Sequence, residues 1–215
     1  MPPPPNVRRR QALADAAIEV LGRSGIHGLS HRAVDERAGL PAGTASNYFR
    51  SRDALLRAAA ERVVELHQAD MREANGLAGA PIDTGGLIEL IAGSLHYSAT
   101  AHRARYLAIY ELNLEATRRP ELRRALDTVA RTTLDFTVRQ HRDLGLATTR
   151  EEVQTLVTLF GGALLNLAAG PPEEVTPELT RTLARAMVTG AMGRTAGDGC
   201  PPAGESEPGP ESGLS

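Results

Sequence analysis

An all-α fold is predicted for this chain of 215 residues, and three observations predict it. Apolar residues recur every three or four positions along most of the chain, which is the period of a helix that buries one face. No segment alternates between apolar and polar residues as a half-buried strand does. Stretches dense in Gly and Pro separate the helical segments. We expect three N-terminal helices followed by a larger helical body.

The three N-terminal helices have boundaries that can be read from the sequence. Residues 9–23 carry apolar side chains at helical spacing. Ser30 is placed to cap a second helix, and Gly39 supplies the left-handed residue that ends it. Pro41 then fixes φ at the start of a third, short helix over residues 42–49. Two helices joined by so short a turn predict a helix-turn-helix, whose second helix enters the major groove of DNA.

These residues resemble the DNA-binding domain of the tetracycline-repressor (TetR) family of transcriptional regulators. The resemblance covers roughly residues 9–60 and is carried by the helix-turn-helix and by two flanking stretches, which read Gly25-Ile26-His27-Gly28-Leu29 and Tyr48-Phe49-Arg50-Ser51-Arg52-Asp53-Ala54-Leu55-Leu56. It implies a dimeric regulator that binds an operator in double-stranded DNA and responds to a small molecule. Ser46 departs from the family pattern, which usually carries Tyr at that position.

The candidate DNA contacts lie at the helix starts and on the outer side of the third helix. Arg32 and Arg52 are suited to phosphates, and Arg32 also to a guanine edge. Asn47 is suited to adenine, Thr44 to a phosphate or a thymine methyl, and Tyr48 to the DNA backbone. For each of these residues the alternative is an ordinary solvated side chain. The full set of predicted contacts is Ser30, His31, Arg32, Ala42, Gly43, Thr44, Ser46, Asn47, Tyr48 and Arg52.

The charge distribution agrees with DNA binding although the net charge is −2. Residues 1–70 hold ten Arg against eight acidic residues, and a local basic patch matters more than the total. Residues 1–8 are expected to be a disordered Pro-rich basic arm, from which Arg8–Arg10 reach the DNA backbone or minor groove.

The body is predicted to follow a fourth helix that a Ser51 cap opens and that runs to about Glu73. Residues 75–86 are rich in helix breakers and are expected to form a loop. Thr149 and Glu152 form a capping box. The further predicted helices span residues 87–98, 101–117, 120–144, 149–169 and 176–192. We therefore expect a DNA-binding domain over residues 9–54, a ligand-binding and dimerisation domain over 55–195, and a disordered tail over 196–215.

The last two predicted helices are candidates for a dimer interface. The helix over residues 149–169 is apolar on most sides, and such a helix must bury both faces. Either it is the central helix of a monomeric core or, as the resemblance implies, it pairs with its copy in a four-helix bundle. The predicted interface residues are Leu156, Leu159, Phe160, Ala163, Leu164, Leu167, Leu179, Leu183 and Met187.

A pocket for a small-molecule effector is implied by the resemblance, and the body offers some mixed polar and apolar candidates. Tyr106, Tyr110 and Asn113 share one helix face. Each candidate is alternatively an ordinary core or surface residue. The predicted ligand contacts are His96, Tyr97, Tyr106, Tyr110, Asn113, Phe136 and Asn166.

Other classes of function find little support in the sequence. The six histidines are scattered without metal-ligand spacing, and neither a phosphate-binding loop nor a nucleophile motif occurs. We therefore expect no catalysis, no metal and no cofactor. The single Cys200 excludes an internal disulfide framework. No signal peptide and no membrane-spanning run is visible, so we expect a soluble cytoplasmic protein. The sequence predicts a ligand-released repressor, with a transcriptional activator of the same fold or a helical adaptor that does not bind DNA as alternatives.

Overall fold

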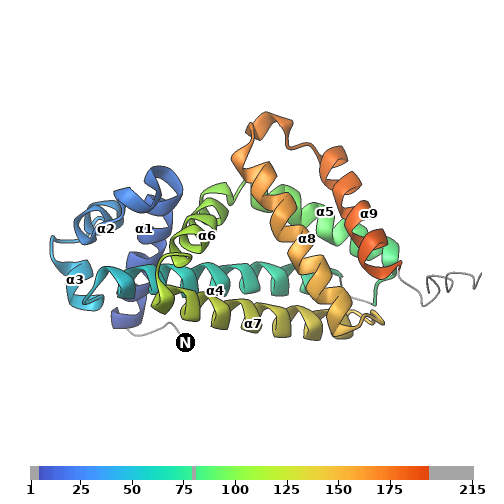
Figure 1. The fold of residues 1–215 in the computed structure, drawn as a ribbon, viewed down its shortest axis with the longest axis horizontal. Coiled ribbons are helices and arrows are strands. Elements are labelled where there is room, and N and C mark those ends of the chain that lie inside the picture. Colours follow the sequence, from blue (N-terminus) through green and yellow to red (C-terminus); the bar gives the residue numbers. More distant parts are fainter. Residues whose placement is uncertain (1–4, 79–80, 194–215) are drawn as a thin grey trace, which may run out of the picture.

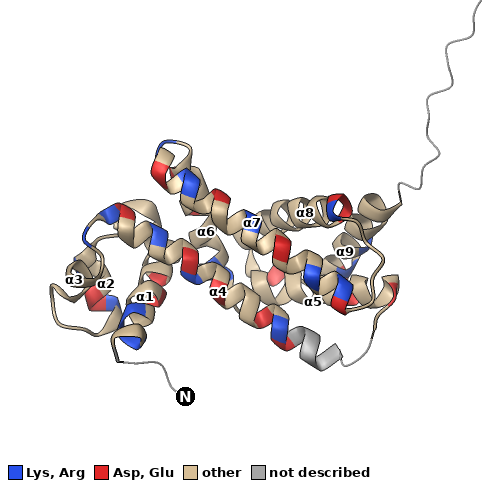
Figure 2. Ribbon diagram, turned by 90° about the horizontal axis from the view of Figure 1, so that it is seen from below, with Lys and Arg blue, Asp and Glu red and all other residues tan. Residues whose placement is uncertain are grey.

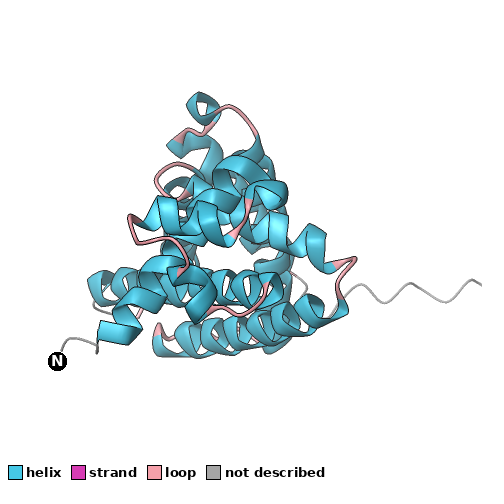
Figure 3. Ribbon diagram, turned by 90° about the vertical axis from the view of Figure 1, so that its left-hand side faces the viewer, coloured by secondary structure: helices cyan, strands magenta, loops and turns pink. Residues whose placement is uncertain are grey.

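The computed structural model describes residues 5–78 and 81–193, and within these ranges all regular structure is helical (Figure 3). This confirms the all-α prediction. The helices are α1 (Pro5–Gly28), α2 (His31–Ala38), α3 (Thr44–Tyr48), α4 (Arg52–Ala78), α5 (Thr84–Ala99), α6 (Arg103–Ala116), α7 (Pro120–Asp143), α8 (Arg150–Ala169), the short 3-10 helix η1 (Pro172–Glu174) and α9 (Pro177–Met192).

Most helix boundaries follow the predicted capping chemistry, and several differ. α5 begins at Thr84, three residues before the predicted start. α1 begins at Pro5, four residues before the predicted start, and continues to Gly28 across a kink at Gly25, whose φ is 63°. α3 has only five residues. α4 runs to Ala78 and so takes up the first residues of the predicted 75–86 loop. The predicted 196–215 tail lies outside the described residues.

One end of the molecule is a head formed by α1, α2, α3 and the start of α4 (Figure 1). Its core is built around the fully buried Phe49, Leu13, Leu21 and Leu29. α1 also packs against α6, and at their crossing a Cβ on Gly22 would overlap the backbone of Ala104. Only glycine allows the two helix backbones to approach this closely.

The body is formed by the long helices α4 and α7, which run side by side, and by α5, α8 and α9 (Figure 1). Its core contains Leu87 and Leu95 of α5, Leu164 of α8 and Val188 of α9. α8 starts at the predicted capping box, in which Thr149 and Glu152 satisfy one another's backbone amides. The structure thereby confirms the helix predicted over residues 149–169.

The head does not end at residue 54 in its packing. Its apolar core continues into Ala108, Leu112 and Ala116 of α6 and into Leu122 and Leu126 of α7. Ile109 packs against both the head core and the body core. The predicted domain boundary between residues 54 and 55 falls inside α4. In space, however, the head core and the body core meet at Ile109 of α6.

Candidate nucleic-acid interface and ligand cavity

The first helix of the predicted helix-turn-helix, α2, has the expected ends. The Oγ of Ser30 accepts a hydrogen bond from the amide of Ala33 (3.1 Å) and caps α2. Gly39 ends α2 in the left-handed conformation, with φ 63° and ψ 32°. These local features fix where α2 starts and stops, as the sequence indicated.

A buried carboxylate, which the sequence analysis did not single out, fixes the position of α3. Asp35 of α2 is only 2% exposed. Its two carboxylate oxygens accept hydrogen bonds from the amides of Gly43 (2.8 Å) and Ala45 (2.7 Å). A charge on the partially positive N-terminus of a helix is stabilising, and hydrogen bonds to an ionised group are strong. Asp35 therefore locks the second helix of the motif onto the first.

Two of the predicted DNA contacts are held by the protein itself. The Nε2–H of His31 donates to the carbonyl of Phe49 (2.7 Å), which ties the start of α2 to the end of α3. The guanidinium of Arg52 donates to the carbonyls of Leu29 and Ile26. These bonds fix the entry to α2, and the phosphate contact of Arg52 stays a prediction.

The remaining predicted contacts form an uncovered surface on α2, the turn and α3. Ser30, Arg32, Ala42, Gly43, Ser46 and Asn47 are exposed, while Thr44 and Tyr48 are half-buried. Arg32 makes an ion pair with Glu36 (2.8 Å) that is itself exposed and is therefore weak. The Oγ of Ser46 donates to the carbonyl of Gly43 (2.9 Å). Asn47 is exposed on this surface, within α3.

Basic residues flank this surface from the start of α1 (Figure 2). Arg8, Arg9 and Arg10 lie in a helix, so the prediction that residues up to 8 form a disordered arm is wrong for residues 5–8. The hydroxyl of Tyr48 donates to the side chain of Asn6 (3.4 Å), and the guanidinium of Arg10 lies 4.8 Å from the ring centre of Phe49. These contacts place the first turns of α1 beside the end of α3.

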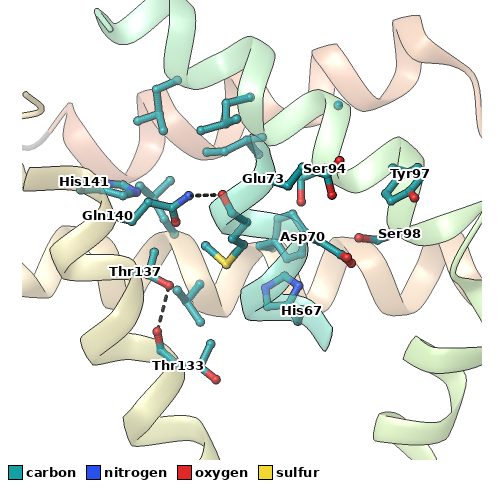
Figure 4. A pocket seen from close by; sticks show the side chains of 18 of the residues that line it. His67, Asp70, Glu73, Ser94, Tyr97, Ser98, Thr133, Thr137, Gln140 and His141 are labelled. Carbon is teal, nitrogen blue, oxygen red and sulfur yellow. Dashed lines mark hydrogen bonds between the residues drawn. The ribbon is translucent and has the colours of Figure 1, made fainter. Parts of the chain in front are cut away.

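The body encloses a cavity of about 480 Å³. Polar side chains from α4, α5 and α7 surround it (Figure 4), and apolar side chains of α5 and α8 complete its wall. It is lined by His67, Asp70, Met71, Glu73, Leu87, Glu89, Leu90, Ile91, Gly93, Ser94, Tyr97, Ser98, Tyr106, Thr133, Thr137, Gln140, His141, Leu156, Val157 and Phe160. Its size and mixed lining are typical of a small-molecule site.

A hydrogen-bonded pair lies at the wall that faces the head. His67 of α4 and Tyr106 of α6 share a hydrogen bond of 2.7 Å between Nδ1 and Oη. Burial lowers the pKa of His67 to about 4 and raises the pKa of Tyr106, because a buried site disfavours the charged form of each. Both groups are therefore neutral near pH 7. The adjacent Asp70 is paired with Arg105 at 2.6 Å.

The predicted ligand contacts are only partly brought together by the fold. Tyr97 and Tyr106 line the cavity. The other five are not among its lining residues. Tyr110 donates to the carbonyl of Gly161 (2.7 Å), and Asn113 and Asn166 donate to carbonyls of their own helices. Phe136 lies under Arg72, and the buried Nδ1 of His96 has no hydrogen-bond partner among the described residues. The fold therefore brings two of the seven predicted ligand contacts to this cavity, and for the other five the ligand contact stays a prediction.

The predicted interface residues divide between the inside and the outside of the protomer. Leu156, Leu164, Leu167 and Met187 are at most 9% exposed within the single chain, so they pack inside the protomer and have little surface left to bury against a second copy. Leu156 and Phe160 line the cavity. Leu159 and Leu179 are 41% and 39% exposed, and Ala163 and Leu183 are half-buried.

Most cavity residues were missed by the sequence analysis. His67, Asp70 and Met71 lie on α4, which was interpreted only as a connecting helix, and Thr133, Thr137, Gln140 and His141 lie on α7. The sequence feature that could have identified the α7 residues is a polar side chain at a position where helical spacing predicts a buried one. Thr137, Gln140 and His141 are all below 10% exposed.

Comparison with known proteins decides the family. Residues 13–59 match the bacterial regulatory proteins of the tetR family, and residues 82–194 match the tetracyclin repressor-like C-terminal domain. The chain belongs to the TetR family. It therefore is a transcriptional regulator with a helix-turn-helix domain and a C-terminal ligand-binding domain, and the family is one of regulators and not of enzymes.

Three relatives of this TetR-family protein cover nearly its whole length. It is 27% identical to the HTH-type transcriptional regulator BetI of Escherichia coli, over 86% of this chain and 93% of BetI. The multidrug binding protein EbrR, solved with ethidium, is 28% identical and has a TM-score of 0.61, over 83% of this chain and 97% of EbrR. A TetR-family regulator from Mesorhizobium loti shares the fold, with 16% identity, a TM-score of 0.71, and coverage of 89% and 98%.

Regulators of this family are soluble DNA-binding proteins. Among the described helices of this TetR-family chain, α8 alone is long and apolar enough to span a membrane by length and composition. One face of α8 lines the cavity and the body core, and its exposed positions from residue 155 onward carry only uncharged side chains.

Proposed function

We propose that the protein is a homodimeric transcriptional repressor that leaves its operator when a small molecule occupies the body cavity. One observation carries the proposal: α4 begins at Arg52, directly after the recognition helix α3, and lines the cavity through His67, Asp70 and Glu73. A ligand that shifts α4 shifts α3 with it. The ligand acts only through its different affinity for the two positions of the helix.

A second connection between cavity and head runs through α6. Tyr106 lines the cavity, and five residues further on Glu111 accepts a hydrogen bond from the amide of Ile26 (3.0 Å). Asp53 at the start of α4 is paired with Arg119 (2.9 Å), just after α6. The C-terminal half of α6 and the residues that follow it are thus linked to α1 and to the start of α4, which flank the helix-turn-helix.

The proposed operator contacts are the exposed or half-exposed positions of α2, the turn and α3. Asn47 reads a base edge, while Arg32 and the basic residues at the start of α1 bind phosphates. Ser46 and Thr44 add shorter polar contacts, and Tyr48 lies against the DNA backbone. The set comprises Ser30, His31, Arg32, Ala42, Gly43, Thr44, Ser46, Asn47 and Tyr48, with Arg8, Arg9 and Arg10 beside it.

The proposed dimer interface is the outer face of α8 and α9. The exposed positions of α8 from residue 155 onward recur at helical spacing and carry no charge: Thr155, Thr158, Leu159, Gly162, Leu165, Asn166 and Ala169. On α9, Leu179, Thr182, Ala186 and Gly190 are exposed. Small uncharged side chains allow two helices to approach closely, as a four-helix bundle requires.

The relatives support control by a ligand. BetI carries the name of a transcriptional regulator, and EbrR was solved with ethidium as a multidrug binding protein. We transfer to this chain the general arrangement, in which a cavity in the helical body holds an organic molecule. We also propose that this regulator acts in the cytoplasm, where its operator is accessible.

Selection of bound duplexes from a random DNA library, at a stated salt concentration, tests the proposal. A dimer with two recognition helices should enrich a pseudo-palindrome whose half-sites lie about one helical turn, ~34–36 Å, or a multiple of it apart. Asn47→Ala should weaken binding by about 1–3 kcal/mol at one base position and relax specificity there. Arg32→Ala should weaken all sequences alike and reduce the salt dependence. An enriched site absent from promoters, or no enriched site, would contradict the repressor proposal.

The dimer interface is tested by one pair of variants. Leu159→Asp places a charge on the outer face of α8 and should shift the protein from dimer to monomer in analytical ultracentrifugation. Leu114→Asp is the matched control, because Leu114 is 62% exposed on α6 and outside the proposed interface. A Leu159→Asp variant that stays dimeric would move the interface elsewhere.

A further inference from the structure

The wall of the body cavity carries acidic groups and no basic ones. Asp70, Glu73 and Glu89 line it, and neither Arg nor Lys occurs among its described lining residues. Its histidines add no compensating charge, since burial lowers the pKa of His67 to about 4 and also lowers the pKa of His141. The cavity therefore has a negative wall near pH 7.

The three carboxylates differ in how far this charge is already neutralised. Asp70 is paired with Arg105 at 2.6 Å, and Glu89 with Arg181 at 2.9 Å, from outside the lining. Glu73 makes no ion pair with any residue of the described ranges and is exposed at the cavity's solvent side. Within the part of the chain that the structure describes, this one carboxylate of the cavity wall thus has no cationic partner.

Aromatic rings are concentrated at the same place. The chain has only four Tyr and three Phe, and Tyr97, Tyr106 and Phe160 all line this cavity. Tyr97 is 51% exposed, on the solvent side like Glu73. Ring faces attract cations, most strongly where the cation is partly desolvated. The remaining wall is largely aliphatic, with Leu87, Ile91 and Leu156 among its members.

We propose that the cavity selects an organic monocation with an apolar body and rejects the corresponding anion. A regulatory role for this ligand rests on the proposed function, whereas the charge selectivity depends only on the cavity. The apolar body lies among the leucines and Phe160, and the positive group lies toward Glu73 and Tyr97. An anion would lose its hydration without meeting a cationic partner, which is costly. Glu73 is the residue that determines this specificity.

The test is a matched series of probes with one apolar chain and three head groups: octylamine, octanol and octanoate. Isothermal titration calorimetry on the full chain at pH 7 should show octylamine, which is protonated there, binding on the order of tenfold more tightly than octanoate. Glu73→Gln should reduce this preference several-fold and leave octanol affinity unchanged. Glu173→Gln is the matched control, because Glu173 is an exposed acid that does not line the cavity.

The outcomes separate this proposal from the proposed function. Equal affinity for octylamine and octanoate, a preference for octanoate, binding of none of the three probes, or a preference that Glu73→Gln leaves intact overturns the proposal. Operator affinity is measured in parallel by fluorescence anisotropy. Selective octylamine binding that leaves operator affinity unchanged supports the cavity's selectivity and contradicts ligand release. An operator that is never bound contradicts only the proposed function.

Discussion

The head and the body differ in how completely their buried polar groups are hydrogen-bonded. In the head, Asp35, His31 and Arg52 each hydrogen bond to backbone groups of another element. In the body, a cavity of about 480 Å³ remains, and the buried Nδ1 of His96 and Nε2 of Gln68 have no hydrogen-bond partner within the described residues. Satisfied polar networks specify one arrangement, whereas cavities and unpaired groups lower the cost of another. The head is built to keep one geometry, and the body to change.

The largest effect is expected from breaking the head's network at Asp35. Asp35→Ala removes two charge-assisted hydrogen bonds to the start of α3 and should lower the free energy of unfolding by about 4 kcal/mol. Urea denaturation measures this, and operator binding should be lost with it. Glu36→Ala, one residue away and exposed, should change stability far less. If both variants lower the free energy of unfolding by the same amount, the hydrogen bonds of Asp35 do not hold the head in one geometry.

The body should respond to pH through its neutral histidines. The pKa of His67 in the folded state, about 4, is below its ordinary value of 6.5 because burial disfavours its charged form. The unfolded chain therefore binds a proton first as the pH falls, so stability is full above 6.5 and declines toward pH 4. The loss from His67 is about 3 kcal/mol. Denaturation at several pH values measures it, and His67→Gln should flatten the profile between those limits; an unchanged profile would contradict the assignment.

Substitutions of two glycines should show a smaller difference between the tightly packed α1–α6 crossing and the cavity wall of the body. Gly22→Ala places a Cβ against the backbone of Ala104 and should destabilise by about 2 kcal/mol, since overpacking forces a backbone shift. Gly93→Ala, on the cavity wall, meets nothing within 4 Å and should stabilise by about 1 kcal/mol through helix propensity. Thermal and urea unfolding measure the change in stability of each variant. If both variants are stabilised, or both destabilised, the proposed difference in packing between the two regions is wrong.

The head was predictable because its determinants are local. Ser30 and Gly39 fix the two ends of α2 through chemistry that a few neighbouring residues complete. The start of α3 was predicted less well, because Gly43 and not Pro41 precedes its first residue. Asp35 was missed for the opposite reason. Its partners are backbone amides eight and ten residues along, and backbone amides leave no mark in a sequence.

The cavity residues were predicted only in part, because helical spacing shows which residues share a helix face but not which other helix packs against that face. Tyr106 and Tyr110 lie on one face of α6, yet Tyr106 reaches the cavity while Tyr110 binds Gly161 of α8. α8 presented a similar difficulty. Its sequence showed that both faces would be covered, and the assignment of Leu156 and Leu164 to the inner face depends on how α5 and α9 pack against it.

The crossing of α1 and α6 at Gly22 has a consequence for how this protein can vary. Gly22 lies in α1, away from the proposed operator surface and outside the cavity lining, so a screen based on either binding site would leave it out. Saturation mutagenesis would nonetheless find it intolerant, because the two backbones leave no space for any larger side chain. In a regulator evolving toward a new operator or a new effector, both sites can drift while this single contact stays fixed.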